Sequence, residues 1–303
     1  MNPTTLDPTG TRTHGALSAR LQSVALWVLA VLLMLAAASY QRRTGPSYPV
    51  RGTVELAGRS VDYQLIRSHL TTSDAIVSLA APEGVSGHLF WRRYGMEEPF
   101  TAVPLRRGDG VLSAALPAQP PAGKLEYHLS LDTPLGTVRL PGAEQGTVVI
   151  RFRGDVPAAV LVPHILLMFL AMLFGMRAGL AALLAPARLR PLTAWSLGLM
   201  SIGGMILGPV VQKFAFGAFW TGFPFGGDLT DNKTLVMWLV WVAAYVLIAA
   251  FPRLDMRVRR AAVAGAAVVM FAVYVIPHSM KGSQLDYEQL ERGVPAAEAI
   301  TTG

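Results

Sequence analysis

Long apolar runs and short alternating runs divide the chain into two kinds of segment. Five runs are uncharged or nearly so and approach the length of about 20 residues that a helix needs to cross a bilayer. These runs are Leu21–Tyr40, Val156–Met176, Ala194–Phe214, Leu235–Phe251 and Ala261–Ile276. We therefore expect a transmembrane anchor helix at 21–40 and a four-helix transmembrane domain at 156–276.

Residues 45–153 have a different pattern, in which short alternating or β-branched runs are separated by turn sequences such as Pro82–Gly84 and Gly108–Gly110. Strands spaced by about 8–12 residues with Pro/Gly turns predict an all-β sandwich, here of immunoglobulin-like length. The chain contains no cysteine. We therefore expect side-chain packing to hold the sandwich together, with Trp91 and Tyr127 in its core.

The placement of arginine predicts how the five helices are oriented. The loops after the second and fourth apolar runs are rich in arginine, whereas the 215–234 loop and the 277–303 tail carry most of the acids that follow the second run. Loops rich in Lys and Arg stay in the cytoplasm. We therefore expect a cytoplasmic tail at 1–20, with the sandwich, the 215–234 loop and the C-terminal tail outside a bacterial inner membrane. Ala36–Ala38 offers a signal-peptidase site as the alternative to an uncleaved anchor.

Composition agrees with a membrane protein. Hydrophobic residues make up 52% of the chain and charged residues 15%, against about 25% charged residues in soluble domains. The net charge of +7 indicates cytoplasmic loops rather than binding of nucleic acid in so apolar a chain. The chain lacks the common nucleotide-binding and hydrolase motifs. We thus expect a mixed fold, a five-helix bundle plus an external all-β domain, without catalytic residues.

Two histidines at the predicted membrane level are the leading candidate site. His164 lies within the second apolar run, and His278 directly follows the fifth. The predicted orientation places both in the outer leaflet, where two imidazoles can supply both axial ligands of a haem iron. Lys233 would then neutralise a haem propionate. Four aromatic side chains of the intervening loop would cover the porphyrin: Phe216, Phe219, Trp220 and Phe223.

The same loop resembles the haem-handling family of cytochrome c assembly proteins, whose signature is a tryptophan-rich external loop flanked by membrane histidines. The segment 216–220 resembles the beginning of that loop, and 231–234 followed by Trp238 resembles its end. Ten residues separate the two pieces, where the family has almost none. The resemblance implies haem b held by His164 and His278, for electron transfer or haem handling. The C-terminal half is also similar to uncharacterised bacterial inner-membrane proteins.

Several structural and functional alternatives stay open. The loop aromatics can form an interfacial belt, and Asp231 or Thr230 can cap the fourth span. His164 and three methionines recur every four residues (Met168, Met172 and Met176), which suits either Cu(I) or ordinary helix packing. The alternative function is a non-catalytic membrane scaffold or partner subunit, whose β-sandwich recruits another exported or membrane protein through an exposed apolar patch.

Overall fold

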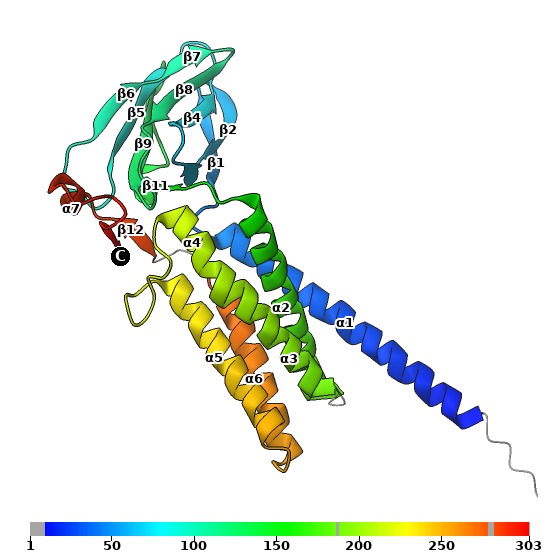
Figure 1. Ribbon diagram of the computed structural model, residues 1–303. Coiled ribbons are helices and arrows are strands. Elements are labelled where there is room, and N and C mark those ends of the chain that lie inside the picture. The colour runs from blue at the N-terminus through cyan, green and yellow to red at the C-terminus, as the bar shows by residue number, and fades with distance from the viewer. Residues whose placement is uncertain (1–9, 186–187, 278–281, 303) are drawn as a thin grey trace, which may run out of the picture. The chain divides into compact units, whose positions relative to one another are not determined.

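The computed structural model describes residues 10–185, 188–277 and 282–302 (Figure 1). The chain divides into two compact units. The first, called here the helical unit, comprises Met1–Tyr40, Ile165–Met205 and Thr234–Ile276. The second, called here the β unit, comprises Gln41–His164, Ile206–Lys233 and Pro277–Gly303. Each unit is described by itself.

Within the described residues, five helical stretches are long and apolar enough to cross a membrane, and they confirm the five helices predicted from the sequence. The helices are α1 (Gly10–Thr44), α2 (Ala158–Leu184), α3 (Leu189–Met200), the π-helix η3 (Ser201–Leu207), α4 (Gly208–Phe216), α5 (Leu229–Ala250) and α6 (Met256–Val275). The elements α3, η3 and α4 follow one another without a break and form a single apolar stretch, Leu189–Phe216. The π-helical segment precedes Pro209, which cannot donate a helix hydrogen bond.

The core of the helical unit consists mainly of small residues, methionines and other aliphatic side chains, together with the rings of Trp241 and Tyr274. Trp241 and Met270 are fully buried, and a side chain at Gly175 would collide with Met270. Met172 and Met176 lie in the same core. Met168 packs against the same core. All three methionines of the predicted stripe therefore serve helix packing, which favours the structural alternative over a Cu(I) site.

The β unit contains the strands expected for residues 45–153, which confirms a domain built from β-sheets. The strands are β1 (Val50–Leu56), β2 (Arg59–Leu65), β3 (Ser68–Leu70), β4 (Ala75–Ala80), β5 (Ser86–Arg93), β6 (Thr101–Pro104), β7 (Arg106–Gly108), β8 (Val111–Leu116), β9 (Lys124–Thr133), β10 (Gly136–Leu140) and β11 (Val148–Arg153). A short 3-10 helix, η1 (Ala143–Gln145), precedes β11.

These strands form three sheets that share one core. Strands β1 and β2 form a hairpin, β4-β8-β7 form a three-stranded sheet, and the largest sheet has the order β3-β11-β9-β5-β6, with β10 also paired to β9. Strand β11 is parallel to β3 and antiparallel to β9. The predicted core residue Tyr127 is fully buried, and its hydroxyl donates to the carbonyl of Ile66 at 2.8 Å. Trp91 is half-buried and packs against the same core.

The C-terminal segment, which the sequence indicated only as an external tail, is folded within the β unit. It contains β12 (Ser283–Leu285), α7 (Tyr287–Glu291) and β13 (Ile300–Thr302), and β12 pairs with β13. Leu285, Tyr287 and Ala299 form a small buried cluster. The Tyr287 hydroxyl accepts a hydrogen bond from the backbone N–H of Lys124 at 3.1 Å. This contact ties the C-terminal segment to the first residue of β9.

Candidate functional site

Three neighbouring strands of the largest sheet bring cationic side chains together. Alternate residues of β11 are buried in the core (Val148, Ile150 and Phe152), so that Arg151 and Arg153 face the other side of the sheet. In the strand register, Arg151 lies opposite Lys124 of β9 and opposite Ser68 of β3. Arg67 immediately precedes β3. Like charges that lie opposite each other on paired strands are unfavourable, and the charge of Asp228 acts on both Lys124 and Arg151 in the favourable direction.

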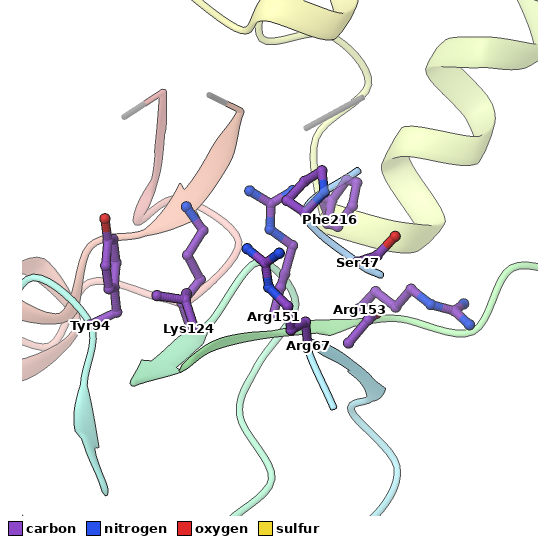
Figure 2. A pocket seen from close by; sticks show the side chains of 10 residues that line it. Ser47, Arg67, Tyr94, Lys124, Arg151, Arg153 and Phe216 are labelled. Atoms are coloured by element: carbon purple, nitrogen blue, oxygen red, sulfur yellow. The ribbon is translucent and has the colours of Figure 1, made fainter. Parts of the chain in front are cut away.

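These side chains line a cavity of about 560 Å³, called here the basic cavity (Figure 2). Its described lining consists of Pro46, Ser47, Arg67, Ser68, Tyr94, Lys124, Val149, Arg151, Arg153 and Phe216. Four of these residues are cationic and none is acidic. Figure 2 shows Lys124 beside Tyr94, with Arg153 extending away from both.

Two aromatic rings lie beside cations of the basic cavity. The Lys124 Nζ is 5.5 Å from the centre of the Tyr94 ring, and the Arg151 Cζ is 5.4 Å from the centre of the Phe216 ring. Phe216 is the last residue of α4. The backbone N–H of Gly154 donates to the carbonyl of Ala215 at 2.8 Å, and a side chain at Gly154 would collide with that part of α4. The glycine therefore allows β11 to reach the end of α4.

Lys124 is the most buried cation of the site. Only 8% of the residue is exposed, and its Nζ donates to Gln284 Oε1 of β12 at 2.8 Å. Burial and the charge of Arg151 lower the pKa of Lys124 to about 8, while the charge of Asp228 acts in the opposite direction. Burial also lowers the pKa of Arg67 and the pKa of Arg151. Desolvation disfavours the charged form of each cation, and a bound anion would offset that cost.

Asp228 is the acid whose charge acts on Lys124 and Arg151, but its carboxylate also holds the surrounding chain in place. One oxygen accepts the backbone N–H of Thr230 at 2.7 Å, in the first turn of α5. The other oxygen accepts the backbone N–H of Ser283 at 2.9 Å, on β12. The prediction that Asp231 or Thr230 caps this helix is therefore corrected. The side chain of Asp228 is the cap, because α5 begins at Leu229.

A second buried acid fixes the loop that precedes α5. Asp231 Oδ2 accepts the backbone N–H of Thr221 at 2.7 Å, and the Gln212 amide donates to the Thr221 hydroxyl at 2.7 Å. Asp231 and Asp228 are each 5% exposed. Both carboxylates are therefore buried structural groups rather than solvated loop residues. Among the described residues, no group of three or more His, Asp and Glu side chains could hold a metal ion.

The aromatic residues predicted to cover a porphyrin have different surroundings. Phe216 lines the basic cavity. Phe219 and Phe223 are 57% and 69% exposed. Trp220 is half-buried, and its indole N–H donates to the carbonyl of Phe223 at 3.0 Å. The loop is thus fixed by its own hydrogen bonds and presents phenylalanine rings outward.

His164 and Lys233 also belong to the β unit. His164 is half-buried in α2. Lys233 is 6% exposed, and its amine donates to the carbonyl of Pro277 at 3.2 Å. This bond places Lys233 beside the residue that precedes His278. His278 itself lies outside the described residues, so its pairing with His164 around one iron stays a prediction.

The basic cavity was not found from the sequence. One signal was available, because cations alternate with apolar residues through Ile150-Arg151-Phe152-Arg153 at the end of β11. The approach of Lys124 and Arg67 to Arg151 depends on strand pairing, which the sequence pattern does not specify. In comparisons with known proteins, no family model and no curated protein matches the chain. The assignment of function therefore rests on the chemistry of the site.

Proposed function

We propose that this chain is an integral membrane protein whose β unit binds an anionic ligand in the basic cavity. The proposal rests on the described residues that line the basic cavity, four of which are cationic and none of which is acidic. An anion there would receive charge-assisted hydrogen bonds from Lys and Arg donors. It would also relieve the repulsion between Lys124 and Arg151, which lie opposite each other.

We also propose that the β unit lies outside the cytoplasm and that its strands form an immunoglobulin-like sandwich. With five spans, the segments at 45–157, 217–228 and 276–303 fall on one side of a membrane. All three belong, wholly or almost wholly, to the β unit. The short connections at 185–188 and 251–255 fall on the other side, close to most of the arginines of the C-terminal half. Retention of Lys- and Arg-rich connections in the cytoplasm supports this orientation.

The anion proposal is tested by titrating the purified full chain in neutral detergent with inorganic pyrophosphate, followed by calorimetry and thermal unfolding. A ligand at 100 times its Kd stabilises the folded state by about 2.7 kcal/mol. We expect that stabilisation in the wild type and its loss in Arg153→Gln, whose side chain is exposed on the cavity. The control is Arg106→Gln, an exposed arginine of β7 outside the cavity. Equal binding by both variants, or no binding by the wild type, would contradict the proposal.

Haem b held by His164 and His278 is a second proposal. The bond from Lys233 to Pro277 favours it, because it brings a predicted propionate partner beside the segment that contains His278. In an absorption spectrum of the reduced protein, expressed with ample haem, we expect a Soret band with sharp α and β bands that His164→Ala and His278→Ala both abolish. A spectrum without these bands would exclude haem and leave the anion proposal untouched.

The scaffold alternative has less support. It predicts an apolar patch on the β-sandwich. The large exposed apolar side chains of the described 50–153 segment are Ile76, Tyr94 and Leu135. They come from β4, from the end of β5 and from the β9–β10 turn, and Tyr94 belongs to the basic cavity.

A further inference from the structure

We infer that the anion bound in the basic cavity is the phosphate headgroup of a membrane amphiphile. This inference rests on the proposed anion site and names the chemical class of its ligand. Three features of the cavity support it: the kind of cations, the size of the space, and the position of its lining residues at the ends of apolar spans.

The cations suit phosphate better than a single carboxylate. Three of the four are arginines, Arg67, Arg151 and Arg153, and the planar guanidinium group matches phosphate oxygens in a bidentate manner. A phosphate monoester carries a charge of about −1.5 to −2 and three strong acceptor oxygens. One phosphate monoester therefore neutralises more of the positive charge of these cations than a carboxylate of charge −1 does.

The cavity is larger than a phosphate group needs. Its volume of about 560 Å³ falls within the range of about 300–1,000 Å³ that is typical of sites for small organic molecules. The Tyr94 ring and the Phe216 ring add apolar surface to the lining. The ligand should therefore carry an organic part next to its phosphate.

The lining residues include positions at the ends of two apolar spans. Phe216 is the last residue of the span Leu189–Phe216, and Pro46 and Ser47 follow the span Ala19–Thr44 directly after Gly45. The ends of transmembrane helices lie at the level of lipid headgroups. Three phenylalanines of the loop after α4 are strongly exposed, at 57%, 69% and 83% (Phe219, Phe223 and Phe225). Exposed aromatic rings next to a span end are typical of the membrane interface.

The test uses the full chain reconstituted in nanodiscs of phosphatidylcholine that contain a minor fraction of phosphatidic acid, whose headgroup is a phosphate monoester. Bound lipid is counted by native mass spectrometry after release from the disc. We expect the wild type to retain the anionic lipid at least tenfold more than Arg153→Gln or Lys124→Gln does, and Arg106→Gln to behave like the wild type. Circular dichroism of each variant checks that it folds. If Lys124→Gln does not fold, because Lys124 is buried, the result for Arg153→Gln alone decides the test.

A second arm separates the source of the phosphate from the anion site itself. Glycerol 3-phosphate and citrate are titrated against the detergent-purified protein in calorimetry. Tight binding of glycerol 3-phosphate without retention of anionic lipid would overturn the membrane amphiphile and leave the anion site standing. Binding of citrate alone would overturn the phosphate assignment in the same way. Binding of neither lipid nor soluble anion would overturn both this inference and the proposed function.

Discussion

Two groups of charged residues on the same sheet differ in the sign of the charges that face each other across neighbouring strands. On β9, Glu126 lies opposite Arg92 of β5, and the Arg92 Nε donates to Glu126 Oε1 at 2.6 Å. Two residues earlier, Lys124 lies opposite Arg151 of β11. The first pair brings opposite charges together, whereas the second brings like charges together. Because the same strand contributes to both, the difference comes from residue choice and not from sheet geometry.

The neighbouring arginine follows the first pattern. Arg93 donates to Glu98, and its Nη1 lies 2.7 Å from Glu291 Oε1. These hydrogen bonds raise the pKa of Arg93 above its ordinary value. The basic cavity, by contrast, has no acid in its described lining. The charges of the first region are balanced by acids on the same sheet or on α7, whereas those of the second are the cations that we propose bind an anion.

The largest effect is expected when the second region is converted to the pattern of the first. Arg151→Glu places an acid opposite Lys124 and adds negative charge to the cavity. Loss of a buried ligand-binding charge costs about 2–5 kcal/mol, so we expect the affinity for pyrophosphate to fall by roughly 30-fold or more. Calorimetry on the full chain measures the change. The control is Arg106→Glu, which changes the net charge by the same amount on the exposed strand β7. A comparable loss of affinity in that variant would show that the effect comes from the overall charge of the protein and not from the cavity.

Removal of Asp228, whose charge acts on Lys124 and Arg151, tests whether its role is in stability or in anion binding. Asp228→Ala removes the cap of α5 and the bond to β12. Loss of a cap and of a buried acceptor costs about 1–3 kcal/mol, so the thermal unfolding midpoint should drop. Anion affinity should stay equal or rise, because a repelling carboxylate is gone. The control is Glu83→Ala, at an exposed turn. A drop of equal size in the unfolding midpoint of that variant would contradict the structural role of Asp228.

The local patterns of the sequence predicted the apolar helices and the β-strands of 45–153, but they predicted neither the folded C-terminal segment nor the site. Hydropathy located all five helices, because it depends only on neighbouring residues. It placed the start of the fourth span at Leu235, whereas α5 begins at Leu229, since the first turn is polar and is stabilised by Asp228. Three of the four cations of the cavity, Arg67, Lys124 and Arg151, meet only through the register of β3, β11 and β9.

The pH dependence of anion binding should distinguish the two regions further. Lys124 faces Arg151, the Tyr94 ring and Gln284, with the charge of Asp228 nearby, and its pKa is about 8. Because only the protonated amine attracts an anion, affinity for sulfate should be full below pH 7 and fall by about tenfold above pH 9. Calorimetry at several pH values measures this.

The pH effect on stability in the absence of ligand has the opposite sign. The pKa of Lys124 in the folded state is below its ordinary value, so the unfolded chain binds this proton more tightly. The contribution of this lysine to stability should therefore rise as pH increases from about 8 toward its unfolded pKa of about 10.4. In Lys124→Gln the pH dependence of sulfate affinity should disappear, and the rise of stability with pH should become smaller, because the contribution of this lysine is removed. A pH-dependent sulfate affinity in that variant would assign the titration to another group.

The smallest effect is expected in the region where charges are already paired. Arg92→Gln removes the ion pair with Glu126, in which the arginine side chain is 32% exposed. Cross-strand and partly exposed ion pairs contribute about 0.2–1 kcal/mol, so the unfolding midpoint should fall slightly. The affinity for pyrophosphate should equal that of the wild type, because Arg92 does not line the basic cavity. If Arg92→Gln weakened anion binding as much as Arg153→Gln, binding would respond to the total charge of the sheet. The distinction between the Arg92–Glu126 ion pair and the cations proposed to bind an anion would then be wrong.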